Sequence, residues 1–244
     1  MGSCHDHILS DEPGSGRTVL IREGNQPAAT KALEAKYGLD KPMAERYFTY
    51  ISDAAHGDFG DSLKQRGRTV MDIIATKFPV SARLGGMAVV LALCVGVPLG
   101  VLAAYKRGTF IDSLFSVIAT CGIAVPGFVI CTLLLYVFGV KLQWLPTLGL
   151  KSAQSYIMPV VALAAYPTSY IMRLMRSSML DVLGQDYMRT AKAKGLSQKV
   201  SLFKHALRNA ILPVITYVGP MLAYTLTGSF VTEKIFTIPG LGGE

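Results

Sequence analysis

The sequence predicts an all-α protein that crosses a membrane four times. Of its 244 residues, 51% are apolar and only 16% are charged, against about 25% charged in an average soluble domain. Four long runs carry no Asp, Glu, Lys or Arg, at residues 84–105, 113–140, 156–172 and 211–232. A helix of about 20 residues spans the hydrocarbon core of a bilayer. The runs therefore predict a transmembrane domain at 83–232 and exclude an ordinary soluble enzyme.

The distribution of charge predicts how the chain is oriented in the membrane. Residues 1–82 hold 10 Lys/Arg and 11 Asp/Glu, whereas residues 83–244 hold 14 Lys/Arg and 5 Asp/Glu. Eight of these 14 basic residues lie between the third and fourth runs, in residues 173–210. Loops rich in Lys and Arg stay on the cytoplasmic side. We therefore expect a cytoplasmic loop at 173–210 and an extracytoplasmic tail at 233–244.

The N-terminal third contains no run long enough to span a membrane. Residues 1–20 are polar and rich in Gly and Ser, a composition typical of disorder, and we interpret them as a disordered or non-native start. Residues 21–82 are expected to be an extracytoplasmic helical region. Its three predicted helices lie at 27–37, 42–55 and 69–78. Pro79 is expected to end the last of them, because proline lacks the N–H donor of a helix interior.

The runs contain features of closely packed and interrupted helices. Gly96 and Gly100 are four residues apart in the first run, a spacing that lets two helices approach closely. Prolines within the runs favour kinked or broken helices. Polar side chains on such helices are candidates to line a path, although Ser and Thr also join helices by hydrogen bonds. The candidates are Thr168, Ser169, Tyr217, Tyr224 and Thr225.

Several kinds of chemistry have no residues to carry them in this sequence. The four runs contain no Asp, Glu, Lys, Arg or His, which intramembrane proton relays need. No Gly-x4-Gly-Lys-Ser/Thr motif is present to hold ATP phosphates, and no His-Glu-x-x-His motif is present to hold zinc. We therefore predict no enzymatic activity, no catalytic residue and no metal site in this chain.

The basic loop contains two predicted helices. Residues 187–194 form the first, which Gly195 ends, and Ser197 can cap a second at 198–209. The predicted apolar stripe of the second helix consists of Val200, Phe203, Leu207 and Ala210. Two short helices with a basic surface fit docking to a partner protein or contact with anionic lipid. The residues alone leave both alternatives open.

The same loop resembles the E-A-A-x3-G signature of permease subunits of ATP-binding cassette importers. Arg189, Thr190 and Ala191 stand at its start and Gly195 at its end. The segments 190–196 and 205–213 are similar to the dipeptide and oligopeptide branch of these permeases. Further matches occur in the same order along the chain, at 37–42, 57–60, 96–100 and 233–242.

The resemblance implies the fold of a type I ABC importer transmembrane domain, with four of the usual six spans present. It implies a permease subunit in the cytoplasmic (inner) membrane of a bacterium or archaeon, forming part of a path for peptides. The ATPase-docking residues that it implies are Arg189, Thr190, Ala191, Lys192, Lys194, Gly195, Leu196 and His205.

The implied partners are a second permease subunit, two ATPase subunits, an extracytoplasmic solute-binding protein and membrane lipids, with no nucleic acid. ATP and Mg are expected in the ATPase subunits, so that this chain holds no cofactor. A permease for nickel or another small solute is the alternative function. A membrane-anchored nucleic-acid-binding protein is a remote one.

Overall fold

The computed structural model describes residues 42–243 except 63, 66, 198–199 and 228–229. The chain divides into two compact units, Met1–Gly60 and Asp61–Glu244, which are described separately. In the first unit, α2 (Met43–Ala55) confirms the helix predicted at 42–55 and buries none of its residues. The helix predicted at 27–37 lies outside the described residues.

The second unit begins with the longest described helix, α3 (Val70–Tyr105). It starts where the sequence predicted: Thr69 and Asp72 each accept a hydrogen bond from the other's backbone N–H, as in a capping box. The helix does not end at Pro79, so that part of the prediction is wrong. A proline inside a helix costs about 3 kcal/mol, which the burial of the following residues against other helices offsets. α3 is therefore continuous across residue 82, where the sequence placed the edge of the transmembrane domain.

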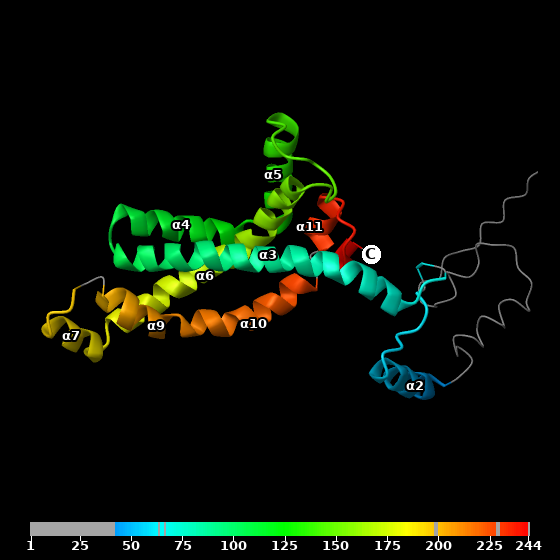
Figure 1. Ribbon diagram of the computed structural model, residues 1–244, viewed down its shortest axis with the longest axis horizontal. Helices are drawn as coiled ribbons and strands as arrows, with labels where there is room; N and C mark the ends of the chain where they lie inside the picture. The colour runs from blue at the N-terminus through cyan, green and yellow to red at the C-terminus, as the bar shows by residue number, and fades with distance from the viewer. Residues whose placement is uncertain (1–41, 63, 66, 198–199, 228–229, 244) are drawn as a thin grey trace, which may run out of the picture. The chain divides into compact units, whose positions relative to one another are not determined.

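The second apolar run is not one straight helix. It forms α4 (Phe110–Ala124), α5 (Gly127–Leu134) and the π-helical η1 (Leu135–Lys141). The axis bends by 102° between α4 and α5, as Figure 1 shows. Pro126 disfavours the helical conformation of the residue before it, and Val125 is accordingly extended. The apolar run at 113–140 therefore forms two helical segments joined by a bend.

The remaining elements complete an all-helical unit. They are η2 (Ala153–Tyr156), α6 (Ile157–Leu183), α7 (Asp186–Ala193), η3 (Ser201–Ala206), α9 (Leu207–Ala210), α10 (Leu212–Leu226), α11 (Phe230–Ile235) and η4 (Leu241–Gly243). Among the described residues, three helical stretches are long and apolar enough to cross a membrane, or four if the bent pair counts as one. The described residues form no β-sheet, and the prediction of an all-α membrane protein is confirmed.

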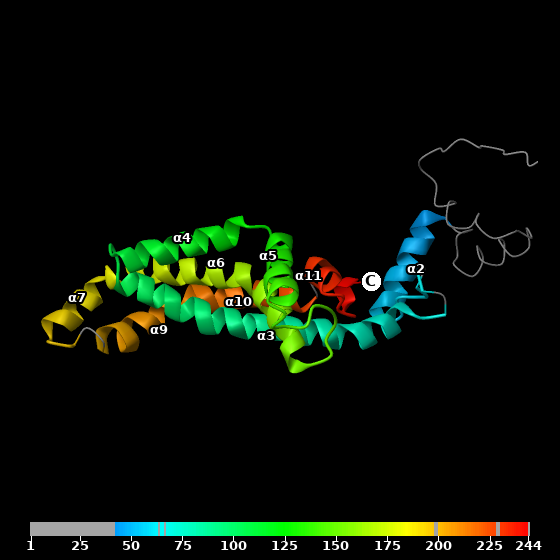
Figure 2. The same cartoon turned by 90° about the horizontal axis from the view of Figure 1, so that it is seen from above.

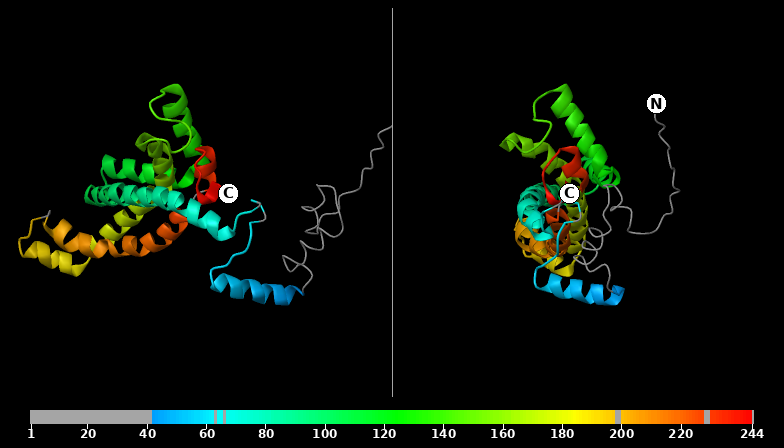
Figure 3. Two further views of the ribbon diagram at one scale, coloured as in Figure 1. Left: turned by 45° about the vertical axis from the view of Figure 1, so that its right-hand side comes forward. Right: turned by 90° about the vertical axis from the view of Figure 1, so that its right-hand side faces the viewer.

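The close approach of α3 and α6 organises the unit. A Cβ added at Gly96 would lie 2.8 Å from the carbonyl oxygen of Thr168, and one added at Gly100 would lie 2.6 Å from that of Met172. Only a residue without a Cβ fits so close to a neighbouring backbone. The prediction that this glycine pair allows close helix packing is confirmed. Figure 3 shows α3, α6 and α10 end on, gathered in one bundle from which α5 projects.

Two hydrophobic clusters lie at opposite ends of this bundle. The loop end comprises α7, η3 and α9, and the tail end comprises α11 and η4 (Figure 2). Buried residues of the loop-end cluster include Met175, Met179, Met188, Leu202 and Ala206. Buried residues of the tail-end cluster include Leu84, Cys131, Met158, Phe236 and Ile238. α3 and α6 contribute to both clusters, so these two helices connect one end to the other.

Candidate functional site

The loop between α6 and α10 begins with a short, defined helix. α7 (Asp186–Ala193) confirms the helix predicted at 187–194. Gly195 follows with a φ of +76°, and the N–H of Leu196 bonds to the carbonyl oxygen of Ala191 at 3.3 Å. A glycine in the left-handed conformation together with this hydrogen bond is the Schellman motif, which ends many helices. The predicted role of Gly195 as the end of the helix is confirmed.

Most of the expected docking residues lie on the surface of this helix and its end. Arg189, Thr190, Lys194, Gly195 and Leu196 are exposed, whereas Ala191 and His205 are half-buried. Lys192 belongs to α7, but its side chain lies outside the described part.

Two exposed side chains of α7 bond within the helix. Thr190 Oγ1 donates to the carbonyl oxygen of Asp186 at 3.1 Å, and Arg189 makes an exposed 3.4 Å pair with the Asp186 carboxylate. A Cβ added at Gly195 would meet nothing within 4 Å. The structure therefore presents a helix end whose backbone is satisfied and whose outer surface is open.

The inner face of α7 is anchored to the second half of the loop. Met188 is fully buried and belongs to the loop-end cluster with Leu202 and Ala206. Asn209 Nδ2 also donates to the hydroxyl oxygen of Tyr187 at 3.0 Å. The loop is therefore a small folded element held against the end of α6.

Half of the apolar stripe predicted for the second loop helix is wrong. Val200 and Phe203 are exposed, whereas Ala210 is buried and Leu207 packs half-buried against the loop-end cluster. The other buried residues are Ser201, Leu202 and Ala206. The reason is local: η3 is a π-helix, whose i to i+5 hydrogen bonds change which residues share a face. The start of the predicted helix at 198–199 lies outside the described residues.

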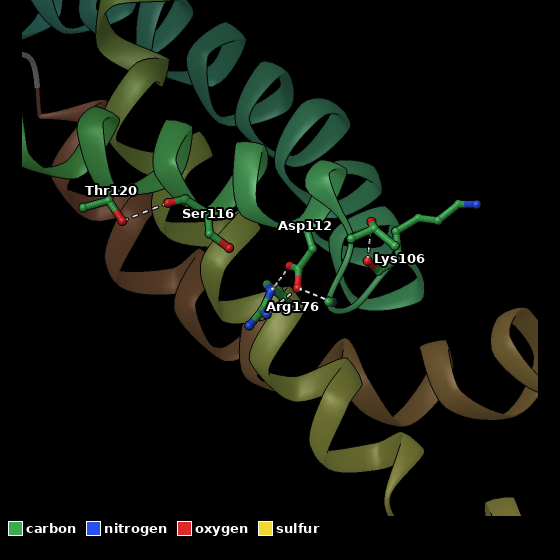
Figure 4. A network of polar contacts seen from close by, with 7 residues as sticks. Lys106, Asp112, Ser116, Thr120 and Arg176 are labelled. Carbon is green, nitrogen blue, oxygen red and sulfur yellow. Dashed lines mark hydrogen bonds and ion pairs between the residues drawn. The ribbon is translucent and has the colours of Figure 1, made fainter.

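An ion pair beside the loop end was not foreseen in the sequence. Asp112, in the first turn of α4, accepts bonds from Arg176 Nε at 2.6 Å and Arg176 Nη2 at 2.9 Å (Figure 4). It also accepts the N–H of Gly108 at 3.0 Å. The Asp112 side chain is 8% exposed and that of Arg176 is 30% exposed. Both lie just beyond the runs drawn from sequence, and the helices extend past those runs to include them.

The pair joins two segments that are far apart in sequence. A bidentate Arg–carboxylate contact fixes both position and orientation. It therefore ties the turn between α3 and α4 to the last turns of α6, directly before the loop. In the sequence, Asp112 stands next to one apolar run and Arg176 next to another. These positions alone do not show that the two residues form a pair.

Three of the five candidate path-lining residues lie in helix contacts of this chain. Ser169 and Thr225 are buried and Thr168 is half-buried. The hydroxyls of Thr168 and Thr225 donate to carbonyl oxygens one turn earlier in their own helices. Thr225 lies where two helices cross closely, because a Cβ added at Gly85 would contact the backbone of Thr225.

The two tyrosine candidates are more accessible. Tyr224 is 72% exposed, and Tyr217 of α10 is half-buried with its ring centroid 4.4 Å from that of Tyr170 of α6. Tyr170 in turn stacks on Tyr166 at 6.3 Å. Sequence reasoning missed Tyr166 and Tyr170, although their four-residue spacing on a helix was a usable signal.

At the tail end, a buried carboxylate holds the last turn of the chain. Glu233 is 1% exposed, and its Oε1 accepts the hydroxyl of Ser81 of α3 at 2.8 Å. The same Ser81 oxygen accepts the N–H of Leu241 at 2.8 Å, and the Glu233 carbonyl oxygen accepts the N–H of Ile238 at 2.8 Å. The motif at 233–242 is therefore folded inward, with hydrogen bonds that join α3, α11 and η4.

Comparison with known protein families gives a match over more than half of the chain. The family described as "Binding-protein-dependent transport system inner membrane component" matches residues 96–243. The matched range includes the loop, the ion pair and the tail motif.

Individual proteins and one solved structure are also similar. The dipeptide transport system permease protein DppB of Bacillus subtilis is 47% identical over 219 residues, covering 90% of this chain and 71% of that protein. The oligopeptide transport system permease protein OppB of Salmonella typhimurium is 44% identical over 218 residues, covering 88% and 71%. A crystal structure of an amino acid ABC transporter with histidines shares the fold, with a TM-score of 0.52 at 17% identity over 70% of this chain and 75% of that one.

Proposed function

Because this chain belongs to the family of binding-protein-dependent transport system inner membrane components, we propose that it is the permease subunit of a peptide importer. It forms part of the path for peptides across the cytoplasmic membrane of a bacterium or archaeon. The choice of peptides as cargo is supported by two relatives, one named for dipeptide and one for oligopeptide transport.

The observation that carries the coupling role is the open, satisfied end of α7. Arg189, Thr190, Lys194 and Leu196 are exposed around Gly195. A compact helix end whose backbone needs no further partner, and whose surface is apolar and basic, fits the groove of another subunit. In this proposal the other subunit is an ATPase, and its acidic groups meet the basic residues of the loop.

Motion of the docked loop reaches the spans through contacts that already exist. α7 is connected to α6 by only two residues, Gly184 and Gln185, and buried Met188 fixes it to the loop-end cluster. The Asp112–Arg176 pair ties α6 to α4. A displacement of the loop therefore moves α6, α4 and α3 together, as rigid-body rocking of packed helices requires.

The transport system needs components beyond this chain. We propose a second permease subunit, two ATPase subunits and an extracytoplasmic solute-binding protein as partners. ATP and Mg belong to the ATPase subunits in this proposal, and the chain itself catalyses no reaction. Tyr217 and Tyr224, with Thr168, Ser169 and Thr225 close by, are the proposed path-lining residues, and the exposed tyrosines are their most accessible members.

The test uses the complete transporter in proteoliposomes, with peptide uptake and ATP hydrolysis measured together. Thr190→Glu places a bulky negative charge on the exposed docking surface, and we expect uptake and substrate-stimulated hydrolysis to fall at least tenfold. Gln185→Glu is the matched control, because it adds the same charge at the other end of α7, outside the docking residues. Wild-type coupling in Thr190→Glu, or equal loss in both variants, would contradict the docking role. Uptake of another solute without any uptake of peptides would contradict only the proposal that peptides are the cargo.

A further inference from the structure

A cavity of about 230 Å³ lies between α3, α4 and α6. Its lining includes Ala103 of α3, Phe115, Ser116 and Thr120 of α4, and Arg173 and Arg176 of α6. Its walls are therefore apolar on one side and carry guanidinium and hydroxyl groups on the other. Figure 4 shows Ser116 and Thr120 following Asp112 along α4, beside Arg176.

The cavity has an excess of positive charge and of free hydrogen-bond donors. Both Asp112 oxygens are engaged, by Arg176 and by the N–H of Gly108, so this acid is already neutralised. Arg176 uses Nε and Nη2 for that pair, which leaves Nη1 as a donor. Within the described part of the chain, Arg173 makes no hydrogen bond or ion pair and the Ser116 hydroxyl makes no hydrogen bond. An anion with several oxygens is the ligand that matches such a donor set.

The cavity lies at the depth of lipid headgroups. From the start of the helical stretch at Ala153, Arg173 is about 20 residues along the axis, or about 30 Å. That distance equals the thickness of the hydrocarbon core, so Arg173 and Arg176 reach the boundary at the loop end. Ser116 and Thr120 lie deeper, further along α4 from the same boundary. Large apolar side chains are also exposed on the side of α4 that is turned away from the lining residues, namely Leu114, Val117 and Ile118.

We propose that this cavity binds the phosphodiester group of an anionic phospholipid from the cytoplasmic leaflet. Arg173 supplies the free guanidinium, Arg176 Nη1 and the Ser116 hydroxyl supply further donors, and the acyl chains extend into the surrounding bilayer. The headgroup then fills the space between α4 and α6 next to the ion pair that joins them. The choice of leaflet rests on the proposed function, in which the loop docks to an ATPase and therefore lies on the cytoplasmic side, whereas the donor set does not depend on it.

The experiment measures lipid retention by the purified full-length chain, released from bilayers that contain phosphatidylglycerol or phosphatidylcholine. Native mass spectrometry counts the lipids that stay bound. We expect one phosphatidylglycerol per chain to be retained, and no phosphatidylcholine. Arg173→Ala should weaken retention about tenfold or more, which is typical of losing one charged hydrogen bond to phosphate. Arg173 is exposed, so this substitution leaves the fold intact, and an unchanged melting profile verifies that.

Arg107→Ala is the matched control, since it removes the same charge from the turn between α3 and α4 without lining the cavity. Retention should be unchanged in this variant. Equal losses in Arg107→Ala and Arg173→Ala would overturn the proposal, because they indicate a diffuse electrostatic field. Equal retention of both lipids would also overturn it. Displacement of the lipid by millimolar inorganic phosphate would identify a free-anion site instead. No transport partner is present in this assay, so its failure leaves the proposed function untouched.

Discussion

At the loop end of the bundle, the residues around Gly195 are exposed, whereas at the tail end the residues around Gly240 are buried. A Cβ added at Gly195 would meet nothing within 4 Å, and one added at Gly240 would contact Glu233 and Ser81. Both glycines belong to segments that resemble family motifs. The structure shows that the two segments differ in burial: Gly195 is exposed and Gly240 is buried.

The difference separates motifs that hold the fold from motifs that need a partner. The tail motif has an internal explanation, because Glu233 Oε1 and the N–H of Leu241 bond to Ser81 and because Phe236 and Ile238 are buried within this chain. Within the described residues, the exposed side chains of Arg189, Thr190 and Lys194 make no hydrogen bond or ion pair outside α7. The docking proposal accounts for this surface by a partner outside this chain.

The largest expected effect on stability is at Gly240. We predict that Gly240→Val lowers the free energy of unfolding by about 1–3 kcal/mol, as overpacking of a tight site does, because the new side chain must displace buried Glu233 from Ser81. The melting temperature of the detergent-solubilised chain is the measurement, and a fall of several degrees is expected. Gly219→Val is the control, since a Cβ at Gly219 meets nothing within 4 Å. If both variants melt at the same temperature, Gly240 is no more tightly packed than an open position. The contrast between the tail end and the loop end would then be lost.

The same substitution at the loop end should affect coupling, because the strain acts on the exposed turn that ends α7 and not on a buried cluster. Gly195 has a φ of +76°, where a β-branched residue is strained by about 1–3 kcal/mol. We predict that Gly195→Val distorts the end of α7 and reduces peptide uptake by the complete transporter more than tenfold. Gly195→Asn should retain most of the uptake, because Asn tolerates this conformation. If both variants transport normally, the shape of this turn is not needed for docking.

An intermediate effect is expected at the pair that joins α4 to α6. Asp112→Asn leaves Arg176 without a carboxylate partner, and removing one member of a fully buried pair costs about 3–5 kcal/mol. Arg176 is 30% exposed and water can solvate it, so we predict a smaller loss of about 1 kcal/mol. The melting temperature is again the measurement.

A second variant isolates the ion pair from packing. Asp112→Leu combined with Arg176→Met removes both charges, and we expect it to be closer to wild type than Asp112→Asn, since no charge is left unpaired. A double variant as unstable as the two single effects added together would show that the groups do not interact.

Local features of the fold were predictable from sequence. The end of α7 at Gly195 and the close approach at Gly96 and Gly100 each depend on residues a few positions apart. Patterns within a few residues show where a residue without a Cβ, or one that tolerates positive φ, is needed. The bend before α5 had its signal in Pro126, one of the prolines that predicted kinked or broken helices.

Features that depend on tertiary structure were not predictable. The buried face of the second loop helix follows from the π-helical turn in η3, and no periodicity in the sequence indicates that turn. The bond between Asp112 and Arg176 joins residues 64 positions apart. The continuation of α3 past Pro79 depends on packing against other helices. For the ion pair and for Pro79, the competing influence was a contact with a distant part of the chain.

The smallest expected effect concerns charge on the exposed loop, and it tests whether shape or charge dominates docking. Lys194 is exposed directly before Gly195. Exposed ion pairs contribute about 0–1 kcal/mol, so we predict that Lys194→Ala changes peptide uptake by less than about fivefold, and that the change shrinks at high salt because surface charges are screened. Lys194→Glu should weaken uptake further at low salt only. A loss in Lys194→Ala as large as in Gly195→Val, and independent of salt, would show that this one cation has a partner in a desolvated contact, and that the open turn alone does not explain docking.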